Sequence, residues 1–161
     1  ARFLTPIVFL PALACQADTA NPEIDARQHL RIATQALGYR EERRVDETEF
    51  LRLARQEGAV ILDARSADKY ALLHVRGAVN LPFTDMTAES LSAALPGKDT
   101  LVLIYCNNNF ENNVAPVVLK SAPLSLNIQT FINLYGYGYR NVYELGDVVN
   151  FNDPKVRWVR G

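Results

Sequence analysis

Short apolar segments alternate with polar ones along the chain from residue 45 onward. Several of these segments are only a few residues long and rich in Val, Ile, Leu and Tyr, which is typical of buried strands. The expected strands are 59–63, 78–81, 101–105 and 141–145. Helical spacing occupies the segments between them, at 46–57, 66–73, 87–95 and 124–135. This order predicts an α/β fold, with helices on both faces of a mainly parallel sheet of about five strands.

Residues 1–17 have a different pattern: one early basic residue, an apolar stretch, and then small residues. Ala12 and Ala14 stand where a signal peptidase reads small side chains. The apolar stretch is too short to span a bilayer as a permanent anchor. We therefore expect 1–17 to be a secretory signal peptide rather than a buried first helix, and the protein to be periplasmic or secreted.

The position of signal cleavage decides whether Cys15 remains in the mature protein. Cleavage after Ala14 would leave Cys15 first, as in a bacterial lipoprotein, but Ala12 stands three positions before it, where lipoproteins usually have Leu. Cleavage after Ala17 would remove Cys15 and leave Cys106 as a lone thiol in an oxidising compartment. We favour the second alternative, in which an unpaired Cys106 calls for a functional explanation.

The segment 18–44 is expected to be an N-terminal helical extension that packs outside the core. Its helix is predicted to start near Pro22 and to stop at Gly38. One face of that helix would hold Ile24, Leu30, Ala33 and Leu37. The third unit, 45–161, would then be a single α/β domain, because a chain of 161 residues is too short for two domains of ordinary size.

Composition excludes several classes of function. Charged residues make up 22% of the chain and the formal net charge is −1, so there is no basic footprint for nucleic acid or for an anionic membrane. The two histidines, His29 and His74, do not form metal-ligand spacing with Cys106, and no phosphate-binding glycine-rich motif occurs. We expect neither a metal nor a cofactor, and we expect a monomer.

Cys106 is the most informative residue. It follows the apolar run 101–105, which predicts a buried central strand, and ligands of α/β sheets gather just beyond the carboxyl ends of such strands. The polar tract 107–113 comes directly after it and is rich in Asn, which tolerates the tight backbone of a loop whose N–H groups turn inward. This arrangement suits either a reactive thiolate or a buried thiol without chemistry.

The motifs around Cys106 resemble those of the rhodanese domain family. Asp63-Ala64-Arg65 and the run from His74 to Pro82, His-Val-Arg-Gly-Ala-Val-Asn-Leu-Pro, match that family in order and spacing. Gly138-Tyr139-Arg140-Asn141-Val142-Tyr143-Glu144-Leu145 looks like its Gly-Tyr-x-x-Val-x-x-Leu segment, and Cys106 falls where the family has its catalytic cysteine. The resemblance covers residues 45 to about 147.

The resemblance implies a three-layer α/β/α fold and sulfur transfer. In active members a thiolate takes a sulfane sulfur from a donor, carries it as a persulfide, and passes it to cyanide or another thiol. We expect the loop N–H groups and a helix N-terminus to lower the pKa of Cys106 for this purpose. Taken singly, Asp63 and Arg65 are expected to form a structural ion pair, His74 to bond a nearby backbone group, and Gly77 to serve a turn.

The loop after Cys106 departs from the family pattern. Active members commonly carry Arg five residues after the cysteine to hold the anionic donor, whereas this chain has Glu111. We expect either that Glu111 points outward or that the donor is not thiosulfate. Asn112 stands where the phosphatases of this fold have their Arg, so phosphate-ester hydrolysis is disfavoured. The expected loop residues are Asn107, Asn108, Asn109, Phe110, Glu111 and Asn112. The three Asn side chains are expected either to donate hydrogen bonds to sulfur or to form the turn.

An apparent insertion, 114–123, follows the loop before the next helix. Its two prolines predict a semi-rigid flap that either brings Lys120 to the pocket as a replacement cation or leaves it solvated at the surface. We expect an exported persulfide carrier with weak or no activity towards thiosulfate. The alternative is an inactive binding or redox-sensing module with the same fold. The expected partners are a small sulfur donor or thiol acceptor, or a partner protein.

Overall fold

The computed structural model describes residues 21–111 and 119–150, together with the backbone of 158–159. The predicted signal peptide 1–17, Cys15, Asn112 and the first half of the predicted flap, 114–118, lie outside the described residues. No helix in the described ranges has both the length and the apolar content needed to cross a membrane.

A five-stranded sheet forms the centre of the domain, and all of its strand pairs are parallel. Its strands are β1 (Arg44–Val45), β2 (Val60–Asp63), β4 (Val79–Asn80), β5 (Val102–Tyr105) and β6 (Val142–Leu145). The order is β1-β6-β5-β2-β4, so β5 is the central strand. The two short strands β3 (His74–Val75) and β7 (Trp158–Val159) pair antiparallel beside it. The prediction of a parallel sheet of about five strands is confirmed.

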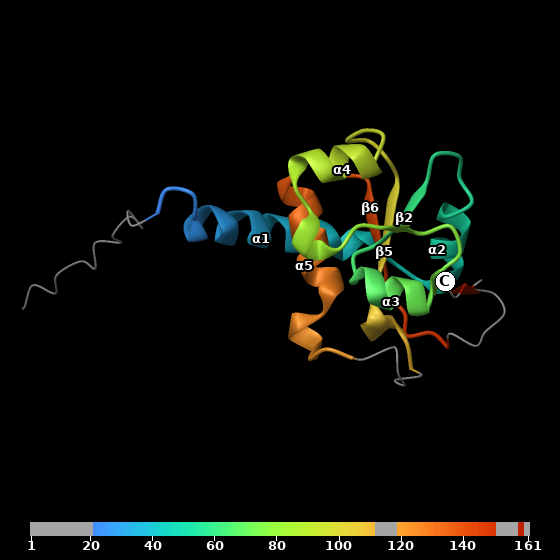
Figure 1. Cartoon of the computed structure of the whole chain (residues 1–161). Helices are drawn as coiled ribbons and strands as arrows, with labels where there is room; N and C mark the ends of the chain where they lie inside the picture. Colours follow the sequence, from blue (N-terminus) through green and yellow to red (C-terminus); the bar gives the residue numbers. More distant parts are fainter. Residues whose placement is uncertain (1–20, 112–118, 151–157, 160–161) are drawn as a thin grey trace, which may run out of the picture.

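Helices cover both faces of the sheet (Figure 1). They are α1 (Ala26–Arg40), α2 (Glu47–Leu53), α3 (Ala67–Leu72), α4 (Ala88–Ala94) and α5 (Leu126–Gly136). Short 3₁₀ turns lie at Glu41–Arg43, Phe83–Asp85, Asn107–Asn109 and Ala122–Leu124. One buried cluster joins α1, α4 and α5 to the sheet, and a second joins α2 and the end of α3 to the opposite face. The predicted three-layer α/β/α fold is confirmed.

Side-chain caps explain where several helices begin. The carboxylate of Asp46 accepts a hydrogen bond from the N–H of Glu49 at the start of α2. Thr87 and Ser90 form a reciprocal capping box at the start of α4. Ser66 is the residue that precedes α3, but its side chain makes no cap hydrogen bond. The three helices nevertheless lie where the sequence pattern places them.

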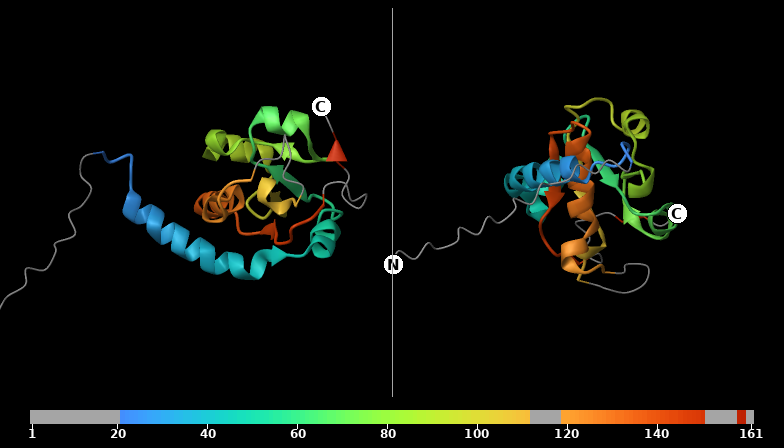
Figure 2. Two further views of the ribbon diagram at one scale, coloured as in Figure 1. Left: turned by 90° about the horizontal axis from the view of Figure 1, so that it is seen from below. Right: turned by 90° about the vertical axis from the view of Figure 1, so that its left-hand side faces the viewer.

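The N-terminal helix differs from its prediction in both its bounds and its buried face. It begins after the cap Asp25 and runs through Gly38 to Arg40, so Gly38 does not stop it. Leu30 is 67% exposed, whereas Ala36 is fully buried in the core cluster. The helix packs across α5 rather than alongside it (Figure 2), and contact with α5 selects the face that contains Ala36. The predicted face and the predicted position outside the core are therefore wrong.

The motif residues His74 and Gly77 have the structural roles expected of them. The Nδ1 atom of His74 lies 2.7 Å from the carbonyl oxygen of Tyr70, and the two rings stack with centroids 3.6 Å apart. Gly77 has a φ of +82°, which favours glycine in the turn before β4. These residues fix the connection between α3 and the edge strand.

Candidate active site around Cys106

Cys106 lies immediately beyond the carboxyl end of β5, as the sequence pattern predicts. Its backbone is extended, and the chain then turns into the 3₁₀ segment Asn107–Asn109. The N–H of Cys106 donates to Oδ1 of Asn109 at 2.9 Å, while the sulfur accepts from the N–H of Asn109. The thiol is thus fixed at the base of a tight loop.

Backbone N–H groups from two elements converge on the sulfur. They come from Asn108 in the loop and from Leu126 and Asn127 in the first turn of α5. The free N–H groups of a helix N-terminus favour a negative charge, so this arrangement stabilises a thiolate. The expected inward N–H groups and the helix N-terminus behind the thiol are both present.

Burial nevertheless dominates the acidity of this thiol. Cys106 is only 2% exposed, and removal from water raises the pKa of the thiol above its ordinary value. The backbone N–H groups lower this pKa, and the negative charge of Glu144 raises it further. The prediction of a lowered thiol pKa is therefore wrong for the covered thiol of this structure.

The loop side chains Asn107 and Asn108 bond to neighbouring parts of the site. The amide oxygen of Asn107 accepts a hydrogen bond from Nη1 of Arg65 at 3.2 Å. The side chain of Asn108 makes two hydrogen bonds with the backbone of Lys120, at 2.7 and 3.1 Å. Both residues line the same cavity as Cys106, so they connect the loop to the cavity walls.

Asn109 clamps the loop to the sheet rather than facing a substrate. Its Nδ2 donates to the carbonyl oxygens of Leu145 and Asp147, at 2.7 and 3.0 Å. Its Oδ1 accepts from Nδ2 of Asn127 at 3.0 Å as well as from the N–H of Cys106. The side chain is 5% exposed. The Asn side chains were expected either to donate hydrogen bonds to sulfur or to form the turn, and the side chain of Asn109 forms the turn.

Two other predicted loop residues lie away from the cavity. Phe110 is 2% exposed and packs edge-to-face against Tyr105, so its side chain lies in the core under α2 and not in the cavity. Glu111 is exposed, and its Oε1 accepts a hydrogen bond from Nδ2 of Asn150 at 2.7 Å. Glu111 is absent from the lining of the Cys106 cavity, in agreement with the outward orientation expected from its charge.

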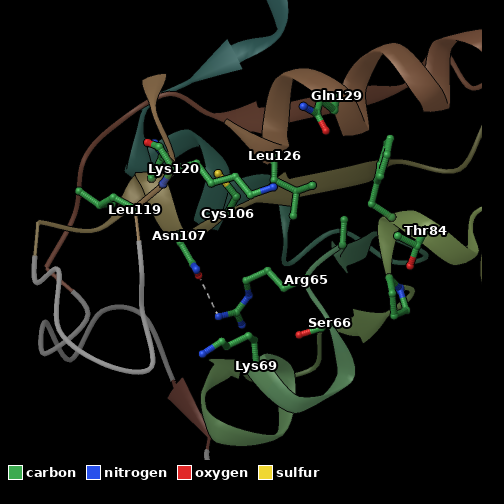
Figure 3. Close-up of a pocket in the computed structure, with 14 residues that line it drawn as sticks. Arg65, Ser66, Lys69, Thr84, Cys106, Asn107, Leu119, Lys120, Leu126 and Gln129 are labelled. Carbon is green, nitrogen blue, oxygen red and sulfur yellow. Dashed lines mark hydrogen bonds between the residues drawn. The ribbon is translucent and has the colours of Figure 1, made fainter. Parts of the chain in front are cut away.

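A cavity of about 390 Å³ opens in front of Cys106. Figure 3 shows Cys106 and Lys120 on one side of it and Arg65, Ser66 and Lys69 on the other. Apolar side chains complete the walls: Ala64, Pro82, Phe83, Leu119 and Leu126. The described residues that line it include three cations and no carboxylate. The cavity therefore suits a ligand that combines an anionic group with an apolar body.

A buried ion pair supports one wall of this cavity. Arg65 donates from Nε and Nη2 to Asp63, with 2.6 Å between Nη2 and Oδ2, and also donates to the carbonyl oxygen of Leu73. Burial alone lowers the pKa of Arg65, but the hydrogen bonds and charge of Asp63 outweigh this and raise it. Tyr105 donates to Asp63 as well, and its own pKa is raised by burial. The structural ion pair expected of Asp63 and Arg65 is present, and Arg65 also lines the cavity.

Sequence reasoning missed several residues of the site. Lys69 has no functional signal of its own in the sequence, Leu126 and Asn127 approach the sulfur through their backbone, and Glu144 lies on another strand. Only the position of Asn127 at a predicted helix start could have indicated its role. Among the residues with described placement, no cluster of three or more His, Cys, Asp or Glu is arranged to hold a metal ion.

Comparison with known proteins supports the same family. The family model described as the rhodanese-like domain matches residues 46–150. A thiosulfate sulfurtransferase, PspE of Escherichia coli, is 27% identical over 96 residues, which is 60% of this chain and 77% of that protein.

Solved structures of rhodanese-like domains also resemble the chain. A solution structure from Anabaena sp. has a TM-score of 0.50 and 20% identity, and the match covers 74% of this chain and 80% of that one. A rhodanese with anions from E. coli has a TM-score of 0.43 and 24% identity, covering 64% and 99%. The family match covers more than half of the chain, and it includes β5, Cys106 and the loop that follows. This protein therefore belongs to the rhodanese-like domain family.

Proposed function

We propose that this protein is a sulfurtransferase that carries a sulfane sulfur on Cys106 as a persulfide. The observation that carries the proposal is the position of the sulfur: it lies at the base of a cation-lined cavity, and N–H groups of the loop and of α5 converge on it. These N–H groups stabilise negative charge both on the thiolate and on the persulfide that replaces it.

The transfer takes place in two balanced steps. After the thiol of Cys106 loses its proton to solvent, the thiolate attacks the outer sulfur of the donor, and a new S–S bond forms. The bond between that sulfur and the rest of the donor molecule breaks, and the rest of the donor leaves with the electron pair of that bond. An acceptor thiolate then attacks the outer sulfur of the persulfide, and the Cys106 thiolate is released.

The cavity favours an organic donor over inorganic thiosulfate. Its volume of about 390 Å³ and its apolar walls leave room for a carbon skeleton, while Lys69 and Lys120 offer cations for an acidic group. Glu111 occupies the position where active family members commonly carry the arginine that holds thiosulfate. We therefore propose organic thiosulfonates or low-molecular-weight persulfides as donors, with weak or no activity towards thiosulfate.

A second candidate function is an inactive binding or redox-sensing module. The observation that favours it is the covered thiol, which is 2% exposed and has a raised pKa. A module would bind its partner through the same cavity without persulfide formation. The two functions therefore differ in whether Cys106 gains sulfur.

Export is part of the proposal. Support comes from the pattern of residues 1–17, where a short apolar stretch is followed by small residues. In an oxidising compartment the mature protein would act as a monomer with Cys106 as its single thiol.

Intact mass measurement tests the persulfide directly. The chain contains two cysteines, so a Cys15→Ser background leaves Cys106 as the only thiol. The reduced protein is incubated separately with benzenethiosulfonate, a low-molecular-weight thiol persulfide and thiosulfate. We expect a gain of one sulfur atom with the organic donors and at least about tenfold slower gain with thiosulfate, because of the charge and size of the cavity.

The matched control is the Cys15→Ser, Cys106→Ala protein, which should gain no sulfur. Added thiol should remove the sulfur from the loaded protein and restore the starting mass. No gain with any donor, from a protein whose thiol is shown by alkylation to be reduced and reachable, would contradict the carrier and favour the binding module.

A further inference from the structure

The helix α1, which precedes the matched family domain, carries an arginine that pairs with a carboxylate of the sheet near Cys106. Arg40 is the last residue of α1, outside the range 46–150. Its Nε and Nη2 donate to the two carboxylate oxygens of Glu144, both at 2.5 Å. The side chains are 11% and 5% exposed, so this bidentate ion pair is almost fully removed from water.

Glu144 and Cys106 lie on the same face of the sheet. In the parallel pair of β5 and β6, Ile104 is the register partner of Glu144. Cys106 comes two residues after Ile104 with an extended backbone, and side chains two residues apart in extended chain share a face. Arg40, Glu144 and Cys106 accordingly line one cavity of about 350 Å³, which shares Cys106 and Asn108 with the cavity in front of the thiol.

The buried carboxylate of Glu144 disfavours negative charge on the sulfur of Cys106, which lines the same cavity. The negative charge of Glu144 raises the pKa of Cys106 even with Arg40 in place. Removing one partner of a buried ion pair leaves an uncompensated charge whose field is poorly screened. Without Arg40, the repulsion between Glu144 and a Cys106 thiolate or persulfide would be stronger.

We propose that Arg40 is a positioning residue for Cys106, in that it neutralises and orients the Glu144 carboxylate so that an anionic sulfur is tolerated beside it. This inference deepens the proposed sulfur transfer and rests on it for its biological meaning. It also assigns a role to α1, which binds the domain by its buried face and supplies the counterion from its last turn.

Other charged groups near the thiol act from different positions. Arg44 on β1 lines the same cavity as Glu144 but is exposed, so water screens its charge. Arg65, Lys69 and Lys120 face Cys106 from the front cavity, and Arg65 is already bonded to Asp63. Among the described residues that line the two cavities, Glu144 is therefore the one anion beside the sulfur, and Arg40 is its buried partner.

The rate of alkylation of Cys106 as a function of pH tests the inference. In the full-length Cys15→Ser protein, the variants are Arg40→Met, Glu144→Gln and the two combined. Arg31→Met is the matched control, because Arg31 lies on the same helix and bonds the exposed side chain of Gln28. Iodoacetamide reports the thiolate fraction without any sulfur donor.

We expect Arg40→Met to slow alkylation at pH 7 by about threefold to tenfold, to move the midpoint of the pH profile upward, and to leave the high-pH plateau unchanged. Glu144→Gln should move the midpoint downward, and the combined variant should recover most of the loss. Arg31→Met should superimpose on the parent protein.

A merely structural role for Arg40 predicts another result. Loosening of α1 would expose the thiol and speed alkylation at every pH, and that outcome would overturn the proposal. An unchanged midpoint in Arg40→Met, or no recovery in the combined variant, would overturn it too. If Arg40→Met does not fold, the downward shift in Glu144→Gln decides the question, and its absence counts against the proposal. Because no donor is used, failure of sulfur loading leaves these readouts intact.

Discussion

At Cys106, two properties of the surroundings have opposite effects on the pKa of the thiol. The N–H groups of Asn108, Leu126 and Asn127 favour a thiolate, while burial at 2% exposure disfavours it. Burial is the larger effect, so the pKa of the thiol is raised in the folded protein. The same N–H groups would stabilise a persulfide, whose charge extends to an outer sulfur nearer the front cavity. The thiol therefore keeps its proton at neutral pH to a greater extent than an exposed cysteine does.

The raised thiol pKa predicts a loss of stability at alkaline pH. Below the pKa of an unfolded cysteine, about 8.5, both states keep the proton and the full contribution of the thiol is present. As pH rises further, the unfolded chain loses its proton first, so unfolding is favoured by up to about 1.4 kcal/mol per pH unit until the folded thiol also ionises. We expect the free energy of unfolding of the Cys15→Ser protein to fall more steeply between pH 8 and 10 than that of the Cys15→Ser, Cys106→Ala protein.

Urea unfolding at a series of pH values measures this difference. The comparison cancels the contribution of Tyr105, whose raised pKa acts in the same direction in both proteins. The cavity left by the Ala substitution changes stability by an amount independent of pH. Parallel pH dependences would show that the folded thiol has an ordinary pKa, and would contradict the dominant effect of burial on Cys106.

The place of Cys106 was predictable, and its acidity was not. The apolar run before it and the motifs around Asp63 and His74 locate a strand end, which local patterning reveals. The pKa depends on how far Leu126, Asn127 and Glu144 approach the sulfur, and these residues come from a helix and a strand remote in sequence. Single-sequence patterns carry no such distances.

At the scale of elements, one side chain joins the active-site loop to its neighbours. Asn109 bonds the end of β5 through Cys106, the region after β6 through Leu145 and Asp147, and α5 through Asn127. Both the oxygen and the nitrogen of its amide therefore have partners in separate elements. The loop keeps its shape because this amide is buried and fully used.

Substitution of Asn109 tests that connection. In Asn109→Ala the buried N–H of Cys106 and the buried carbonyl of Leu145 lose their partner, and so does the partly buried carbonyl of Asp147. We therefore expect a loss of about 2–4 kcal/mol in the free energy of unfolding. Asn108→Ala is the matched control: its two hydrogen bonds are exposed, and we expect a loss below about 1 kcal/mol. Equal losses in urea unfolding would show that the clamp is not centred on Asn109.

Elements with strong local signals agree with prediction, and those shaped by packing do not. The strands β2, β5 and β6 follow from apolar runs, and α4 follows from its cap at Thr87. The face of α1 is different: Leu30 and Leu37 are exposed, whereas the small Ala36 is buried in the core cluster that α1 shares with α5. Hydrophobicity alone favours the larger residues, so the pattern indicated the wrong face.

At the scale of the whole molecule, the folded unit extends beyond the family domain, because α1 is packed onto it. The family match begins at 46, but the core cluster includes Ala36, and Arg40 makes a buried ion pair with Glu144. Tyr39 also reaches across to the carbonyl oxygen of Arg140 through its hydroxyl. An apolar, an ionic and a hydrogen-bonded contact thus join α1 to the sheet and to α5, and we infer that α1 unfolds together with the domain.

A charge placed at Ala36 tests whether α1 and the domain unfold together. In Ala36→Glu a carboxylate would have to enter the fully buried contact between α1 and α5, so we expect the free energy of unfolding of the whole chain to fall by about 3 kcal/mol or more, in one transition. Gln35→Glu adds the same charge to an exposed position of the helix and should change stability by less than about 0.5 kcal/mol. Circular dichroism and the near-ultraviolet absorbance of the buried tyrosines, Tyr105 and Tyr139, give two probes of one process during urea unfolding. If Ala36→Glu reduces helix content at low urea while the main transition stays at its midpoint, α1 detaches by itself, and the extension is an independent addition to the domain.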